Sequence, residues 1–228
     1  MTDDIGKNFL AVNKRIAQAC EASGRELWPQ LLAVSKKHGT DKIKQLLQLG
    51  QQAFGESYVQ EGVQKVEALK NLDITWHFIG PIQSNKTKLI AENFAWVQSV
   101  DRMKVLSRLN DQRPAKLPPL NVLLQLKVGD ESTKSGASQE ALLAMVVALR
   151  TMKNIHFRGL MCIPPPSVDS TVQKSYFSEV LALYKQLQST EPQVDTLSMG
   201  MSGDLEAAIQ MGSTMVRVGT DLFGQRPG

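Results

Sequence analysis

A lysine that could act as a nucleophile follows a short apolar segment near the N-terminus. Leu31 to Ser35 has the composition of a buried strand, and Lys36 and Lys37 come directly after it. Side chains alternate along a strand, so Lys36 falls on the same face as Leu32 and Val34. A lysine at the mouth of a barrel is partly desolvated, which lowers the pKa of its amine and favours attack on aldehydes. The alternative is that Lys36 and Lys37 form a solvated basic corner.

Two segments in the C-terminal quarter have the composition of phosphate-binding loops. Ser198 to Gly203 contains Met201 and Ser202 between glycines, and Arg217 to Thr220 contains Gly219. Small residues let a backbone approach an anion closely, and the first amides of a helix have no partner within it. We therefore expect a phosphate on Ser202, Gly219 and Thr220, although Ser202 and Thr220 could equally be helix N-caps.

Two charged residues accompany these loops. Arg217 shares a strand face with the apolar Met215, and a permanent charge there must meet an acceptor. That acceptor could be a structural salt-bridge partner or an atom of a bound cofactor. Asp204 follows the first loop directly and would repel an anion unless its side chain faces away.

The elements that must position these residues alternate between apolar strands and helices. Buried apolar strands in strict alternation with helices predict a parallel sheet, and eight of them in 228 residues predict a closed barrel. We predict one α/β domain over residues 1–228, a (β/α)8 TIM barrel with an extra N-terminal helix at 3–23, and the rival is an open, doubly wound sheet. The strands are expected at 31–35, 53–54, 75–79, 96–100, 120–128, 156–163, 195–198 and 215–218. The helices are expected at 40–49, 59–69, 85–92, 103–110, 139–149, 172–188 and 204–211.

The bulk composition excludes several classes of protein. The chain is 42% hydrophobic and carries a net charge of +4, but its aromatic content of 6% and scattered basic residues argue against a nucleic-acid partner. The longest apolar run, at 141–149, is too short to span a membrane, and the acidic N-terminus does not resemble a secretory signal. Cys20 and Cys162 have no metal or redox spacing. We expect a cytoplasmic protein without a metal site.

Motifs along nearly the whole chain, in the right order, resemble the pyridoxal phosphate homeostasis proteins of the YggS and PROSC type. The motifs include Ala33-Val34-Ser35-Lys36, residues 54–61, Trp76-His77-Phe78-Ile79-Gly80, residues 83–86, Lys134-Ser135-Gly136, residues 158–161, residues 198–202 and residues 216–220. The resemblance implies a monomeric barrel like the N-terminal domain of alanine racemase. It also implies that Lys36 carries pyridoxal 5'-phosphate (PLP) as a Schiff base and that Arg217 faces the pyridine nitrogen. The phosphate would rest on the segments of Met201, Ser202, Gly219 and Thr220.

Two departures from the family pattern, and two residues whose roles are open, accompany this resemblance. Ser57 stands where the family usually has Asn, which shortens or removes a side-chain contact with the cofactor, and Lys37-His38-Gly39 replaces a Thr, a basic residue and Pro. His77 shares a face with Ile79 and could contact the cofactor or be a core residue. Lys134 could bind cofactor secondarily, but a solvated side chain is the preferred interpretation.

Three functions are compatible with a Schiff-base lysine at position 36 of this barrel. The first is a carrier that stores and delivers PLP and so influences amino-acid and keto-acid balance, with possible transient contacts to PLP-dependent apoenzymes. The second is a slow racemase-like enzyme, and the third is a sugar-phosphate enzyme that uses Lys36. An arginine at the pyridine nitrogen donates no full proton, and the sequence contains no second domain to supply acid–base groups. We therefore expect a carrier with no catalytic residues.

Overall fold

Eight parallel strands close into a barrel in which each strand pairs with its neighbours in chain order, from β1 to β8 and back to β1. The computed structural model describes residues 4–129 and 135–225. The strands are β1 (Gln30–Val34), β2 (Ala53–Glu56), β3 (Thr75–Phe78), β4 (Trp96–Val100), β5 (Leu120–Leu126), β6 (Ile155–Cys162), β7 (Thr196–Ser198) and β8 (Met215–Val218). The predicted (β/α)8 barrel is confirmed, and the open sheet is wrong.

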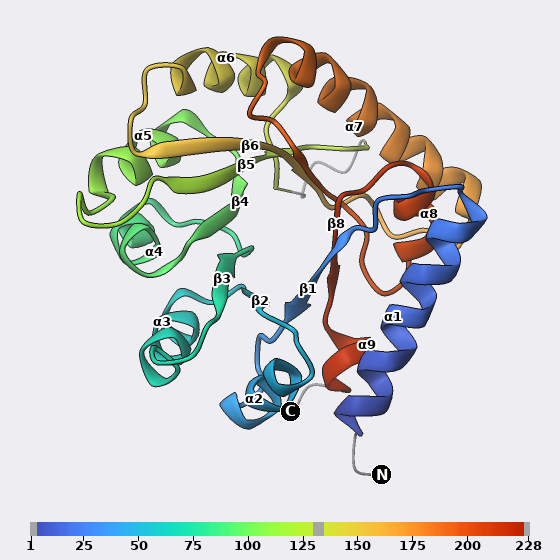
Figure 1. Cartoon of the computed structure of the whole chain (residues 1–228). Coiled ribbons are helices and arrows are strands. Elements are labelled where there is room, and N and C mark those ends of the chain that lie inside the picture. Colours follow the sequence, from blue (N-terminus) through green and yellow to red (C-terminus); the bar gives the residue numbers. More distant parts are fainter. Residues whose placement is uncertain (1–3, 130–134, 226–228) are drawn as a thin grey trace.

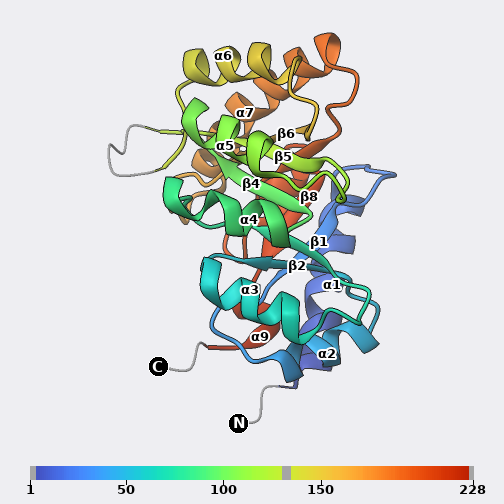
Figure 2. The ribbon, with the colours of Figure 1, turned by 90° about the vertical axis from the view of Figure 1, so that its left-hand side faces the viewer.

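Helices surround the barrel as an outer ring (Figure 1). They are α1 (Ile5–Ala22), α2 (Thr40–Gln48), α3 (Val59–Ala68), α4 (Thr87–Asn93), α5 (Met103–Gln112), α6 (Gln139–Leu149), α7 (Ser170–Thr190), α8 (Leu205–Gln210) and α9 (Thr220–Phe223). Figure 2 shows α3, α4 and α5 following one another along the outside of β2 to β5. No helix within the described ranges is both long and apolar enough to cross a membrane.

The extra N-terminal helix is confirmed as α1. Asp4 caps it by accepting a hydrogen bond from the Lys7 amide, and one face of the helix is buried. The helix packs against α8, α9 and α2 on the outside of the barrel (Figure 1). Two short elements differ from the predictions. A 3-10 turn, η1 (Ser84–Lys86), precedes α4, and the sequence pattern did not reveal α9.

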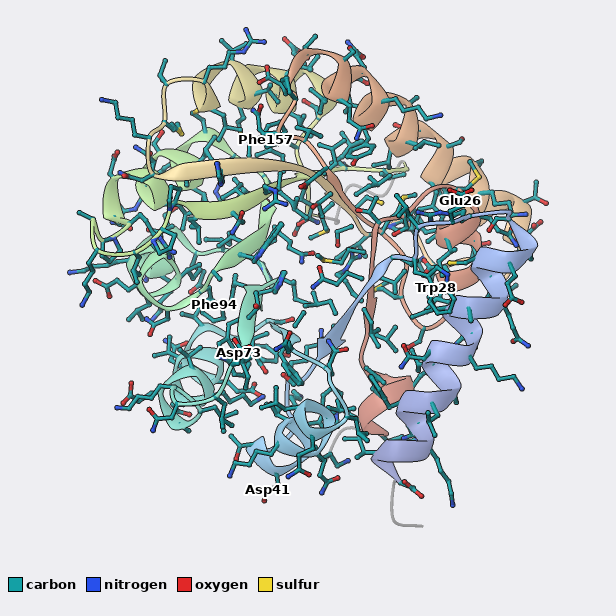
Figure 3. All side chains as sticks on the ribbon, viewed as in Figure 1. Glu26, Trp28, Asp41, Asp73, Phe94 and Phe157 are labelled. Atoms are coloured by element: carbon teal, nitrogen blue, oxygen red, sulfur yellow. The ribbon has the colours of Figure 1, made fainter. Side chains whose placement is uncertain are left out.

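The main hydrophobic core lies between the strands and the helices. Phe94 and Phe157 are buried in this layer, whereas Asp41 lies on the outside of α2 (Figure 3). The barrel interior has a smaller apolar cluster formed by Leu32, Ala53 and Met215. Barrel interiors are filled with side chains, and here polar side chains occupy part of that volume.

The turn after β7 depends on a glycine in the left-handed region. Gly200 has φ +96°, and its carbonyl accepts a hydrogen bond from the backbone N–H of Arg217 at 2.9 Å. A Cβ at this position would lie 2.5 Å from the Cβ of Ala208. The turn that leads into Met201 and Ser202 therefore has no room for a side chain.

We predict that Gly200→Ala destabilises the protein and that Gly203→Ala does not. Alanine at position 200 would combine backbone strain of about 1–3 kcal/mol with a steric clash. A Cβ at Gly203 would meet no atom within 4 Å, which makes that variant a matched control. Urea unfolding measures both free energies, and equal stability of the two variants would contradict the assignment.

Candidate functional site

A cavity of about 250 Å³ lies at the end of the barrel where the strands finish. Seven of the predicted site residues line it: Lys36, Ser57, Met201, Ser202, Arg217, Gly219 and Thr220. The sequence reasoning did not identify its apolar walls, Ile79 and Ile163, which follow β3 and β6. Isoleucines just after apolar strands are indistinguishable from core residues in a single sequence, so no signal marked them.

Lys36 reaches the cavity because the alternation of β1 continues beyond the end of the strand. Val34 and Lys36 both line the cavity. Lys37, which follows Lys36 and precedes α2 in the sequence, is exposed. Pairing of β1 with β8 places Leu32 opposite Arg217. Lys36, just after β1, and Arg217, on the adjacent strand β8, therefore line the same cavity.

A buried ion-pair cluster holds the backbone on both sides of Lys36. The ammonium of Lys65 donates to the Ser35 carbonyl at 2.7 Å and lies 2.8 Å from Glu56 and 2.7 Å from Glu61. Glu61 also accepts a hydrogen bond from the backbone N–H of Lys37 at 2.6 Å, and Lys37 has φ +64°. Burial raises the pKa of Glu56, against the opposing effect of Lys65. Hydrogen bonds to the backbone of Ser35 and Lys37 thus hold the turn that carries Lys36.

Arg217 brings a buried positive charge to the cavity. Its guanidinium donates to the carbonyl and hydroxyl oxygens of Ser198, both at 2.8 Å, and to the Cys162 carbonyl at 2.8 Å. Among the described residues no carboxylate forms an ion pair with it. Burial lowers the pKa of Arg217 and raises the pKa of the Cys162 thiol to about 12, so the thiol supplies no negative charge. Of the two roles considered for Arg217, a structural salt bridge is not observed within the described residues.

The loops after β7 and β8 present backbone amides at the cavity. Within the described part of the chain, the backbone N–H groups of Ser202, Gly203 and Thr220 donate to no protein oxygen. The Asp204 carboxylate accepts from the Met201 N–H at 2.5 Å, so the backbone of its own loop partners it. Unpaired amides beside small residues form a concave site for an anion.

Comparison with known proteins identifies the family. The model of the alanine racemase N-terminal domain matches residues 6–227. A Pasteurella multocida protein is 47% identical over 227 residues, with 97% of each chain covered. A Pseudomonas aeruginosa protein is 48% identical, with 97% of this chain and 96% of the relative covered. Both relatives are named pyridoxal phosphate homeostasis protein. This chain belongs to that family.

Solved structures agree with membership of the pyridoxal phosphate homeostasis family. PipY of Synechococcus elongatus, solved with PLP bound, is 32% identical with a TM-score of 0.84, and 97% of this chain and 100% of PipY are covered. An alanine racemase of Clostridium difficile is 15% identical with a TM-score of 0.76, and the alignment covers 61% of that enzyme. The second likeness concerns the fold alone.

His77 lies inside the barrel and is not among the residues that line the cavity, so the structure does not bring it to the other predicted site residues. It is fully buried, and its ring stacks on Trp96 with the centroids 5.1 Å apart. Its Nδ1 lies 2.9 Å from the Gln98 amide nitrogen, and Gln98 in turn accepts from the Ser198 hydroxyl at 2.7 Å. Of the two possibilities considered, the core residue is the one observed.

Gln98 and Ser198 connect this interior to the site, and sequence reasoning missed both roles. Arg217 donates to Ser198, Ser198 donates to Gln98, and the Gln98 amide donates to His77. Each donor in this chain points from Arg217 towards His77. Nδ1 of His77 therefore accepts the last hydrogen bond, and the proton of the neutral ring is on Nε2. That Nε2 atom is buried with no hydrogen-bond partner in the described residues. A glutamine within an apolar strand was the available signal.

The remaining predictions concern residues beside the cavity. His38 is buried and stacks on Phe223 of α9, with the ring centroids 5.0 Å apart, so it packs against α9. Lys134 lies outside the described residues. Within the described ranges, no group of three or more His, Cys, Asp or Glu residues could hold a metal ion.

We predict that His77 makes the protein less stable as the pH falls. Burial lowers the pKa of His77 to about 3 from its ordinary value of 6.5, so between these values the unfolded chain binds a proton that the folded chain does not. The stability present above pH 6.5 is therefore lost on acidification, by about 2 kcal/mol between about pH 7 and about pH 5.

The variant His77→Phe isolates this contribution because it retains a ring against Trp96 and cannot titrate. Urea unfolding of both proteins at the two pH values gives the change in free energy for each. The wild type should lose about 2 kcal/mol more than the variant. An identical loss in both proteins would show that His77 titrates normally.

Proposed function

We propose that the protein binds PLP, holds it as a Schiff base on Lys36 and acts in PLP homeostasis by storing and delivering the cofactor. One observation carries this proposal: the primary amine of Lys36 and the buried guanidinium of Arg217 line one cavity, between two loops whose Ser202, Gly203 and Thr220 amides donate to no described residue. The relatives named as PLP homeostasis proteins and the PLP-bound PipY structure support it.

The residues present fit each functional group of PLP. When bound, PLP supplies an aldehyde that condenses with an amine, together with a pyridine ring and a phosphate. Lys36 would hold the aldehyde carbon, and Arg217 would donate a hydrogen bond to the ring nitrogen. Ser202, Gly203, Gly219 and Thr220 would hold the phosphate through backbone amides and hydroxyls. Met201 and the apolar side chain of Ile163 would pack against the ring, and Ser57 would lie at the edge of the cavity.

The composition of the cavity favours a carrier over an enzyme. Among the described lining residues, Lys36 and Arg217 are the only ones with ionisable side chains. Guanidinium groups do not give up a proton in proteins, so Arg217 would leave the ring nitrogen neutral and the ring a weak electron sink. Racemisation also needs acid–base groups on opposite faces of a substrate, and the described lining offers no second candidate.

We further propose that the protein works as a single-domain cytoplasmic monomer that releases PLP, directly or during transient contacts, to apoenzymes. Control of free PLP would influence amino-acid and keto-acid balance, since the enzymes that use PLP interconvert these compounds. No nucleic-acid or membrane partner is included in this proposal.

We predict that Lys36→Ala abolishes the visible absorption band of lysine-bound PLP and that Lys37→Ala retains it. Lys36 lines the cavity, whereas Lys37 next to it is exposed, so the second variant removes an equal charge from the same turn. Spectra of the purified proteins with added PLP measure the band. A band that persists in Lys36→Ala would refute the assignment of the lysine.

We predict that the PLP-loaded protein exchanges the α-hydrogen of amino acids in heavy water no faster than free PLP does. The described cavity lining provides no acid–base pair that would accelerate this exchange. Proton NMR of alanine incubated with the loaded protein measures the rate. Clear turnover above the rate of free PLP would refute the carrier and favour the racemase-like alternative.

A further inference from the structure

Arg15 on the N-terminal helix bridges both of the loops that face the cavity. Its guanidinium donates to the Ser202 carbonyl at 2.9 Å, to Glu206 at 2.7 and 2.9 Å and to Asp221 at 2.5 Å. Ser202 belongs to the loop after β7, and Asp221 belongs to α9, which follows β8. One side chain near the N-terminus therefore links two segments near the C-terminus, at Ser202 and Asp221, which lie 19 positions apart in the sequence.

The same contacts offset negative charge beside the cavity. Glu206 and Asp221 lie in the first turns of α8 and α9, four residues after Ser202 and one residue after Thr220 along the chain. Two carboxylates at these positions would repel an anion on the amides. Arg15 pairs with both, and its hydrogen bonds lower the pKa of Glu206 and raise its own. The fork of the guanidinium suits this task, because it presents several donors in a fixed plane.

We propose that Arg15 is a positioning residue for the phosphate of the cofactor, so that the extra helix α1 contributes to PLP retention without contacting PLP. Arg15 holds the Ser202 and Thr220 loops at the separation that a phosphate requires and cancels the charge of the acidic residues behind them. This inference rests on the proposed PLP-binding function, and it assigns a purpose to the packing of α1 against α8 and α9 (Figure 1).

The test compares the affinity for PLP with the affinity for pyridoxal, which lacks the phosphate. Both ligands share the aldehyde and the ring, so their affinity ratio reports on the phosphate site and is unaffected by a uniform loss of stability. Spectroscopic titration of the cofactor-stripped full chain gives both dissociation constants. Inorganic phosphate, added as a competitor, reports on the same loops without the ring.

Arg15→Met should lower the preference for PLP over pyridoxal about tenfold, mainly by weakening PLP binding, and should weaken inhibition by inorganic phosphate. Arg25→Met is the matched control. Arg25 follows α1 and donates to the carbonyls of Ile209 and Ser213 at 2.9 and 2.7 Å, away from both loops. This control should keep the wild-type preference.

An unchanged preference in Arg15→Met, or an equal decrease in Arg25→Met, would overturn the inference. If Arg15→Met does not fold, Arg15→Lys decides the matter, because an ammonium retains the charge but cannot form the same fork. Its preference for PLP should also fall, and a wild-type value would overturn the inference. A wild-type protein that binds neither PLP nor pyridoxal would instead refute the proposed function, so the two failures are distinguishable.

Discussion

A permanent positive charge buried at the mouth of the barrel is the constraint on which the site depends. Arg217 is 3% exposed, and its hydrogen bonds go to uncharged oxygens of Ser198 and Cys162. A charge in such surroundings is stabilised only when donors and acceptors are well arranged, and it attracts an acceptor into any space that it faces. The cavity beside Arg217 is that space. An electron-rich atom of a ligand there would complete the solvation of the guanidinium.

Residues inside the barrel and outside it support the binding groups. Behind Arg217, Ser198 donates to Gln98 and Gln98 donates to His77, so the chain of hydrogen bonds ends on a neutral histidine stacked against Trp96. Outside the barrel, the cluster around Lys65 fixes the turn of Lys36. The binding groups are thus held by surrounding residues that need not touch a ligand, as precise sites generally require.

The fold could be predicted because buried parallel strands and their helices leave strong patterns. The apolar runs at 31–35, 96–100 and 215–218 gave the barrel and placed Lys36 and Arg217 at its open end. The short helix α9 left no pattern, since four residues cannot display helical periodicity. Long-range pairs were also invisible. Arg15 contacts Glu206 and Asp221 across most of the sequence, and no spacing rule connects such residues.

The parts of the site that depend on local sequence were predicted. The parts that depend on how deep a side chain lies in the barrel were missed. Glycine-rich loops after the last two strands are a local signal, and both loops line the cavity. His77 lies one residue before the end of β3, too deep for its ring to line the cavity that Ile79 lines beyond it. The depth of a side chain along a barrel strand depends on where the strand ends, and strand ends are poorly defined by sequence.

Lys36 is the residue that we propose carries PLP. Mass spectrometry of peptides from the PLP-loaded protein, after reduction with borohydride, tests it most directly because reduction makes the lysine linkage permanent. We predict that the reduced cofactor is found on Lys36. Modification confined to Lys37, Lys134 or another lysine, or no modification of a protein loaded with PLP, would contradict it.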